Sequence, residues 1–267
     1  MTAKALLTCD GVARHFGSLA AVDGVSLVIN QGDIVGIGGP NGAGKTTFFD
    51  VVTGLTPASA GRIWFGETEI TNWSADRICQ AGIARTFQLN AAFDSLTVRE
   101  NVEISAYYGR HRRLWPGFRL GARVRRAAAD ALEFVGLADK ADARISDLPV
   151  LDRKLLMIAG AVATNPAMIF LDEPVGGLTP GEIDRIMELV RKLSSAGMTI
   201  LLIEHVMRFL LALSSRVVIM HHGCIIFEGR PDQVANDETV VATYLGEGTR
   251  DRLKRHFAEE SQEIAHG

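Results

Sequence analysis

The chain contains 267 residues, of which 47% are hydrophobic and 22% charged, and its formal net charge at pH 7 is −3. These values are typical of a globular protein with a sizeable core, and they give no general attraction to nucleic acid, so we expect no nucleic-acid partner. The three scattered cysteines form no metal-binding or redox spacing, which fits a reducing compartment. We expect neither a signal peptide nor a membrane-spanning helix, because no apolar run approaches the ~18 residues that cross a bilayer.

Residues 5–30 are predicted to form strands joined by turns, with one turn at Gly17. Phe16, immediately before this turn, has two interpretations: an aromatic that packs at a strand end, or a platform on which an adenine ring stacks. The region therefore predicts an antiparallel β portion near the N-terminus. The next predicted elements are a strand at 61–66, a short helix at 74–82 and an extended segment at 82–88.

A phosphate-binding loop lies between a predicted buried strand, residues 33–37, and a predicted helix, residues 45–53. Its glycines let successive backbone N–H groups point at one phosphate chain, and the helix N-terminus attracts the anion. Lys45 supplies a positive charge to the outer phosphates, and Thr46 offers a hydroxyl to a magnesium ion. The chain is therefore predicted to bind a nucleotide. The candidate nucleotide-binding residues of this loop are Gly39, Pro40, Asn41, Gly42, Ala43, Gly44, Lys45, Thr46 and Thr47.

Residues 96–164 have a mainly helical pattern that is interrupted at residues 109–121. A run of arginines between Arg110 and Arg126 covers the interruption and the residues just after it. A solvated surface explains such a run, and contact with lipid headgroups or with a partner is the alternative. We expect a nucleotide-binding core (residues 1–89 and 161–247), a helical subdomain inserted into it (90–160) and a polar C-terminal tail (248–267).

The predicted core resumes with an apolar strand that ends in Asp172 and Glu173. Another buried strand ends at His205. Strands that alternate with helices predict a mainly parallel sheet covered on both faces, so the predicted fold class is α/β. The elements of this part are a strand at 168–171, a helix at 180–196, a strand at 198–203 and a hairpin around Gly223.

The strand ends of this second part carry the other half of a nucleotide site. Asp172 can hold the magnesium ion, directly or through water, and Glu173 can polarise the attacking water as a general base. A lone Asp-Glu pair after an apolar strand is a turn or capping pair about half the time. A complete phosphate loop in the same chain favours the catalytic interpretation here. His205 can reach the terminal phosphate from the next strand, although a lone histidine is usually structural.

Taken together, these motifs resemble the ATPase subunits of ATP-binding cassette (ABC) transporters over about residues 5–247. The phosphate loop matches the first nucleotide motif of the family, and residues 168–174 match the second. The resemblance implies that Phe16 stacks on adenine, that Gln88 belongs to the glutamine loop and that His205 is the switch histidine. It further implies catalytic roles for Glu173, His205, Gln88 and Lys45, and a magnesium ion bound by Thr46, Gln88 and Asp172, with ATP as the nucleotide.

Within this family, several strings are most similar to importers of branched-chain amino acids. This resemblance implies membrane permease subunits as partners, a solute-binding protein acting indirectly, and a location at the cytoplasmic face of the membrane. The implied function is ATP-driven uptake of branched-chain amino acids or of related amino acids or amides. The strings are Gly82-Ile-Ala-Arg-Thr-Phe-Gln, Leu96-Thr-Val-Arg-Glu-Asn-Val, Gly136-Leu-Ala-Asp, Ala163-Thr-Asn-Pro, Leu202-Ile-Glu-His and Tyr244-Leu-Gly-Glu.

One segment departs from the family pattern. The signature, a Leu-Ser-Gly-Gly-Gln-like stretch that caps the nucleotide of the opposite subunit, corresponds here to residues 148–152. Pro149 lacks both a hydroxyl and an N–H, Leu151 adds bulk where the backbone should approach the nucleotide closely, and Asp152 adds a negative charge near a phosphate, where repulsion opposes closure. A second departure is Thr179, where relatives carry Asp or Asn. We interpret the signature as degenerate.

An intact half-site combined with a degenerate signature predicts a heterodimer with a second ABC ATPase, in which one composite site hydrolyses ATP. Three alternatives stay open: the ATPase of an exporter, a non-transport ABC ATPase that clamps nucleic acid or ribosomes, and a mainly regulatory ATP-binding subunit. The apparently intact Glu173 and His205 argue against the regulatory subunit. The second cassette or long arms that clamps generally carry are not found in this sequence.

Overall fold

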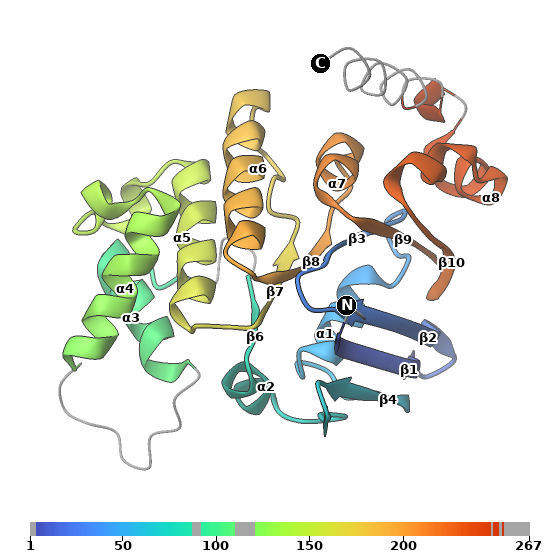
Figure 1. Cartoon of the computed structure of the whole chain (residues 1–267), viewed down its shortest axis with the longest axis horizontal. Helices are drawn as coiled ribbons and strands as arrows, with labels where there is room; N and C mark the ends of the chain where they lie inside the picture. Colours follow the sequence, from blue (N-terminus) through green and yellow to red (C-terminus); the bar gives the residue numbers. More distant parts are fainter. Residues whose placement is uncertain (1–3, 87–91, 110–120, 247, 251–252, 254–267) are drawn as a thin grey trace.

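A computed structural model describes residues 4–86, 92–109, 121–246, 248–250 and 253. It contains two β-sheets and a set of helices, with the helices α3, α4 and α5 gathered at one end of the molecule and the antiparallel strands at the other (Figure 1). The larger sheet lies between these two ends. The fold is therefore layered around that sheet.

The smaller sheet is antiparallel and has the strand order β2-β1-β4-β5. A turn at Gly17, with φ of 60°, joins its first two strands, and positive φ is a conformation that glycine adopts at little cost. The strands are β1 Ala5–Phe16, β2 Leu19–Asn30, β4 Ala60–Phe65 and β5 Thr68–Glu69.

The larger sheet has the order β10-β9-β3-β8-β7-β6 and is parallel except for the β9–β10 hairpin. Its central strands are continuous apolar runs because helices and the smaller sheet cover both faces. This arrangement confirms the α/β class with a mainly parallel sheet and an antiparallel N-terminal portion. The strands are β3 Ile34–Gly38, β6 Ile83–Arg85, β7 Met168–Asp172, β8 Thr199–Ile203, β9 Arg216–His221 and β10 Cys224–Gly229.

Three helices, α3, α4 and α5, pack against one another (Figure 1). Helix α5 runs through residue 160, so the boundary expected there falls within one helix; the domain limits stay a prediction. The α-helices are α1 Lys45–Val52, α2 Ala75–Ala81, α3 Val98–Tyr108, α4 Ala122–Val135, α5 Val150–Ala163, α6 Pro180–Ser195, α7 Met207–Leu213 and α8 Glu238–Val240. Short 3₁₀ segments lie at Ala138–Lys140, Ile145–Asp147 and Pro231–Asn236, and a π-helical turn at Val241–Leu245.

Thr179 is the N-cap of α6 and forms a capping box with Glu182. The Thr179 backbone N–H and hydroxyl both donate to Glu182 Oε2, at 2.8 and 2.7 Å, and Pro180 occupies the first helical position. These interactions satisfy polar groups that a helix start otherwise leaves without partners. The threonine at this departure from the family pattern therefore has a local structural function in its own chain.

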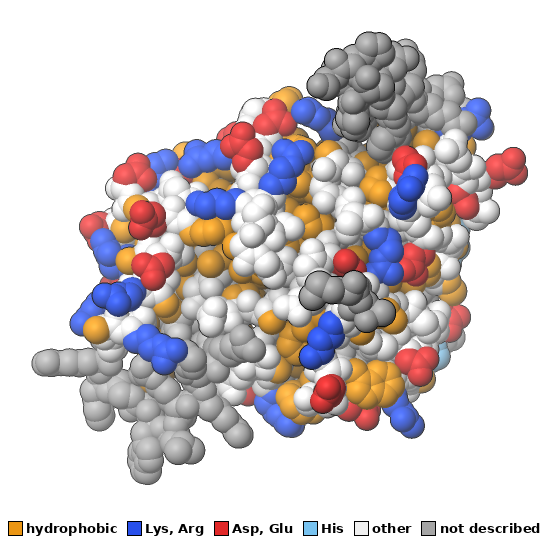
Figure 2. All heavy atoms as spheres, viewed as in Figure 1, with side chains coloured by type: hydrophobic (Ala, Val, Ile, Leu, Met, Phe, Trp, Pro, Cys, Tyr) orange, Lys and Arg blue, Asp and Glu red, His pale blue; other side chains and the backbone are white. Residues whose placement is uncertain are grey.

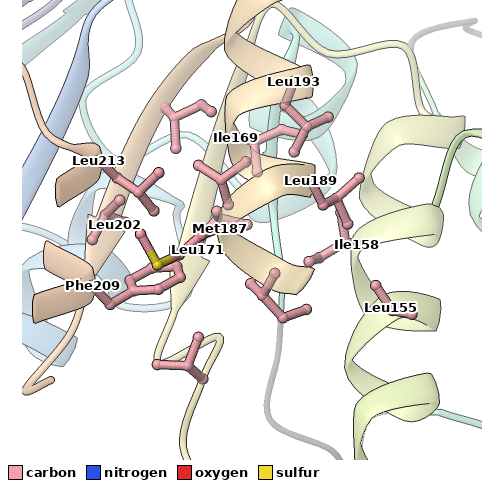
Figure 3. Close-up of a cluster of buried hydrophobic side chains, with 14 of the residues drawn as sticks. Leu155, Ile158, Ile169, Leu171, Met187, Leu189, Leu193, Leu202, Phe209 and Leu213 are labelled. Atoms are coloured by element: carbon pink, nitrogen blue, oxygen red, sulfur yellow. The ribbon is translucent and has the colours of Figure 1, made fainter. Parts of the chain in front are cut away.

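The core consists of two clusters of buried side chains, one on each face of the larger sheet. In one cluster, leucines and isoleucines from α5, α6, α7, β7 and β8 converge, as Figure 3 shows for Leu155, Ile169, Leu189, Leu202 and Phe209, among others. The other cluster fills the space between the larger sheet, α1 and the antiparallel sheet. The two clusters hold the strand ends in place.

Lysine, arginine, aspartate and glutamate side chains are interspersed over the face seen in Figure 2, with neither sign dominating. Within the described ranges, every helix is too short or too polar to span a membrane.

Phe49→Ala tests the packing between α1 and the sheet. The Phe49 ring is fully buried and meets Phe170 of β7 edge-on, with 4.8 Å between ring centroids. Removing it leaves a cavity, and we expect the free energy of unfolding to fall by about 3–5 kcal/mol in a denaturant titration. Val28→Ala, on an exposed position of β2, is the control and should change it by less than about 0.5 kcal/mol. A loss below about 1 kcal/mol for Phe49→Ala would contradict the packing.

Candidate nucleotide site

Three neighbouring parallel strands end at the same edge of the larger sheet. β3 leads into the phosphate loop, β8 into Glu204 and His205, and β7 ends at Asp172 and is followed by Glu173. The registers pair Ile37 with Ile203 and Ile203 with Asp172, so these ends lie level with one another. Open α/β sheets bind ligands at this edge. The sheet thus brings together the two halves of the site that the sequence predicts.

Two glycines of the loop are required by close contacts. Gly39 has φ of 141°, and a Cβ there would lie 2.2 Å from the Met220 carbonyl oxygen of β9. Gly44, the N-cap of α1, has φ of 99°, and a Cβ there would lie 2.2 Å from the Ala21 carbonyl oxygen of β2. No other residue type fits either position without moving backbone. The outer wall of the loop is therefore formed by both sheets.

Lys45 lies at the centre of the loop. Its ammonium donates hydrogen bonds to the carbonyl oxygens of Gly39 and Pro40, at 2.7 and 2.8 Å, and its side chain is almost entirely buried. Burial lowers the pKa of Lys45, and the charges of Glu173 and Asp172 oppose this shift. The carboxylates at the end of β7 are thus close enough to act on the Lys45 charge.

A cavity of about 570 Å³ opens beside the loop. Phe16, half exposed at the end of β1, lies on its wall, which favours the stacking interpretation of this residue over strand-end packing. The Arg14 guanidinium lies 4.4 Å from the centre of the Phe16 ring. Sequence reasoning missed His222, which reaches the cavity from the β9–β10 turn. The lining residues are Phe16, Leu19, Ala20, Ala21, Asn41, Gly42, Ala43, Gly44, Lys45, Thr46, Thr47, Glu173 and His222.

Asp172 is buried and forms an ion pair that the sequence does not predict. Arg85 Nη2 donates to Asp172 Oδ2 at 2.7 Å, and both side chains are only 7% exposed. The same guanidinium donates through Nη1 to Asp50 of α1 at 2.6 Å and to the Thr53 hydroxyl at 3.2 Å. Arg85 thereby joins the end of β7 to α1. In the sequence, Arg85 is marked only by its place within the string Gly82-Ile-Ala-Arg-Thr-Phe-Gln.

Glu173 has a side chain that is 45% exposed and a backbone with φ of 47°. This left-handed conformation costs a non-glycine residue about 1–2 kcal/mol, and it directs Glu173 out of the strand. The Glu173 N–H donates to the Ile203 carbonyl at 3.0 Å, and His205 Nδ1 lies 4.0 Å from Glu173 Oε1. His205 is 55% exposed, so the two side chains face solvent together.

Glu204 and Lys154 support this arrangement from inside. The buried Glu204 carboxylate accepts backbone N–H bonds from Val175, His205 and Val206, at 2.9, 3.1 and 3.2 Å. Burial raises the pKa of Glu204, and these bonds oppose the shift. Lys154 of α5 donates to the Glu173 carbonyl oxygen at 2.9 Å. The bonds from Val175 to Glu204 and from Lys154 to Glu173 join segments 29 and 19 residues apart, which the local motifs do not reveal.

The donor set at this edge consists of oxygens, the type of ligand that Mg²⁺ prefers. Thr46 supplies a hydroxyl on the cavity wall and Asp172 a carboxylate whose charge acts on Lys45. Gln88, the third predicted ligand, lies outside the described residues. No cluster of three or more His, Cys, Asp or Glu side chains suited to a metal occurs among the residues that the structure describes.

The signature segment differs from its expected orientation. Asp152, in the first turn of α5, is 3% exposed, and its carboxylate forms an ion pair with Lys140 at 2.5 Å. Leu151, also in this turn, points into the hydrophobic core. Neither side chain faces the surface, so the expected repulsion by Asp152 and the expected bulk of Leu151 toward a nucleotide are wrong. Pro149, the N-cap of α5, and the exposed Val150 remain at the helix start.

Tyr244 brings the C-terminal segment to the base of the loop. Its Cε1 would lie 3.5 Å from a Cβ at Gly38, and burial raises the pKa of its hydroxyl. Tyr244 therefore packs beneath the phosphate loop, although it follows the loop by about 200 residues of sequence.

Comparisons with known proteins agree with this geometry. Residues 22–176 match the sequence model of the ABC transporter family, and residues 224–249 match that of the branched-chain amino acid ATP-binding cassette transporter. The chain is 35% identical over 250 residues to the high-affinity branched-chain amino acid transport ATP-binding protein LivG of Escherichia coli, covering 91% of this chain and 98% of LivG. It is 34% identical to BraF of Pseudomonas aeruginosa, covering 91% and 99%.

Solved structures are similar as well. A nucleotide-free ATP-binding cassette from an ABC transporter superposes with a TM-score of 0.83 and 34% identity, covering 91% of this chain and all of that one. The ADP conformation of an ABC transporter cassette superposes with a TM-score of 0.82 and 35% identity, covering 91% and 99%. The chain therefore belongs to the ABC transporter family as an ATP-binding subunit, an ATPase that couples ATP hydrolysis to transport.

Proposed function

We propose that the chain is the ATP-binding subunit of an importer for branched-chain amino acids. The observation that carries this cargo class is the match of residues 224–249 to the branched-chain family, a segment that includes Tyr244 beneath the phosphate loop. The names of LivG and BraF support the same class of cargo. Permease and solute-binding subunits select the cargo, and this chain supplies the energy from the cytoplasmic face of the membrane.

An apolar groove supports docking of a permease subunit. It has a volume of about 310 Å³ and lies between α2 and β6 on one side and α3 and α5 on the other. Three exposed apolar side chains, Leu55, Phe93 and Tyr108, stand on its wall. Exposed apolar side chains grouped around a groove are typical of interaction sites. We propose that motion of the ATPase subunit passes to the membrane subunits through this groove.

The proposed roles of the site residues follow from their positions. Lys45 and the loop N–H groups bind the phosphates, and Phe16 stacks on the adenine. Thr46, Asp172 and Gln88 hold Mg²⁺, which neutralises phosphate charge and orients the terminal phosphate when bound. Glu173 accepts the proton of the attacking water. His205, 4.0 Å from Glu173, contacts the terminal phosphate from the next strand.

ATP acts by favouring a closed pair of ATPase subunits, because the closed state makes contacts to the nucleotide that the open state lacks. Closure moves the groove and the permease helices docked in it. Hydrolysis removes the terminal phosphate and reopens the pair. The strained backbone at Glu173 and the bond from Lys154 hold the general base in one orientation while this occurs.

We further propose that the second subunit of the pair is a different ABC ATPase. The start of α5 would face the nucleotide of the opposite subunit, and it presents Pro149, without an N–H or a hydroxyl, and the exposed apolar Val150. Both groups are poor ligands for a phosphate. The site that uses this chain's own phosphate loop then takes a competent signature from the partner and hydrolyses ATP.

An ATPase assay of the reconstituted transporter tests the cargo. The chain is reconstituted in vesicles with its permease subunits, its partner ATPase and its solute-binding protein, and ATP hydrolysis is measured with different amino acids. Leucine, isoleucine and valine should stimulate hydrolysis, and lysine and glutamate should not. Stimulation by lysine or glutamate, without any by the branched-chain amino acids, would contradict the proposed cargo.

Glu173→Gln tests the general base. The amide cannot accept the proton, so we expect turnover in the assembled transporter to fall by about 10²–10⁴-fold while ATP binding is retained. Asp184→Asn is the control, because Asp184 of α6 forms an exposed ion pair with Arg208 of α7. This variant should keep turnover within about twofold of the wild type. Normal turnover in Glu173→Gln would remove this role from Glu173.

The concentration dependence of ATP hydrolysis tests the heterodimer. The purified chain alone should bind ATP but stay inactive as its concentration is raised, because two copies lack a competent signature. Adding the second ATPase should restore hydrolysis. A specific rate that rises with the concentration of the chain alone would mean that a homodimer works, and would contradict the proposal.

A further inference from the structure

Arg85 connects three parts of the molecule that the sequence motifs leave separate. Its guanidinium reaches Asp172 of β7 at 2.7 Å and Asp50 of α1 at 2.6 Å, and it also lies on the wall of the apolar groove. Arg85 and Asp172 are both 7% exposed, whereas Asp50 is 31% exposed. The Arg85–Asp172 pair is thus shielded from solvent, which makes its electrostatic interaction strong.

The pair restricts the carboxylate proposed to hold magnesium. Oδ2 of Asp172 accepts a hydrogen bond from Arg85, and the Asp172 N–H donates to the Thr86 hydroxyl at 3.3 Å, so the strand end is held by Arg85, the last residue of β6, and by Thr86 immediately after it. A guanidinium at Oδ2 competes with a cation for that oxygen. Asp50 draws the same guanidinium toward α1, and so weakens this competition.

We propose that Arg85 is a positioning residue that restrains the Asp172 carboxylate and sets how strongly magnesium adds to nucleotide affinity. Asp50 competes with Asp172 for the same guanidinium and so limits this restraint. This inference rests on the magnesium role proposed above for Asp172. A planar guanidinium can bridge two carboxylates, and an ammonium cannot hold both in the same geometry. Position 85 therefore requires arginine and not merely a positive charge.

The test is a ratio of affinities that a folding defect does not change. Binding of a fluorescent, non-hydrolysable ATP analogue to the full chain is titrated in EDTA and in excess Mg²⁺, and the ratio of the two dissociation constants gives the contribution of magnesium. A partly unfolded variant loses binding sites equally in both titrations, so its ratio is unaffected. No hydrolysis is needed for this readout.

Four variants give the expected pattern. Arg85→Gln should raise the contribution of magnesium by about threefold to tenfold, because the competing charge is removed. Arg85→Lys keeps the charge but releases the restraint, and should raise it as well, by a smaller factor. Asp50→Asn removes the second carboxylate that attracts the guanidinium, and should lower the contribution of magnesium. Arg77→Gln, an exposed arginine of α2 stacked on Trp73, should leave it unchanged.

The possible failures can be told apart. If Arg85→Lys equals the wild type, charge alone is responsible and the restraint is refuted. If Arg85→Gln and Asp50→Asn shift the ratio in the same direction, the proposed competition of Asp50 for the guanidinium is refuted. An unchanged ratio in both variants, with a clear magnesium effect in the wild type, overturns only the role of Arg85. A wild type without any magnesium effect overturns the magnesium role of Asp172 as well.

Discussion

Parallel pairing of β3, β8 and β7 is the constraint on which the nucleotide site depends. These strands are buried on both faces, so their registers are fixed by packing, and a slip of one residue would turn every core side chain to the opposite face. The registers bring the phosphate loop, His205 and Glu173 to one edge of the sheet. Lys45 then lies within the electrostatic influence of both carboxylates that follow β7.

Local motifs made much of this site predictable. The phosphate loop, the Asp172–Glu173 pair and His205 each occupy a strand end that apolar patterning already marked, and the α/β class follows from the alternation of strands and helices. The cavity beside Phe16 supports its stacking on adenine, which stays a prediction.

The partners of charged residues could not be predicted. Asp152 was expected to oppose a phosphate because its position matches a surface motif, but the first turn of α5 points it inward, where Lys140 neutralises it. Arg85 and Lys154 likewise act through residues 19 or more positions away. Such pairs depend on how helices pack on the sheet, and one sequence contains no direct record of that packing.

The β9–β10 turn forms part of the wall of the phosphate loop. The Gly223 N–H donates to the Ala43 carbonyl at 3.0 Å, the Asp23 N–H donates to the Gly223 carbonyl at 2.9 Å, and the Met220 carbonyl excludes a side chain at Gly39. The loop itself lies in the first fifth of the chain. During synthesis from the N-terminus, a nascent chain therefore carries the whole phosphate-loop motif long before it has the wall that shapes it. The wall that Met220 and Gly223 provide is available only after the β9–β10 turn has left the ribosome, so the loop cannot reach its final packing before then.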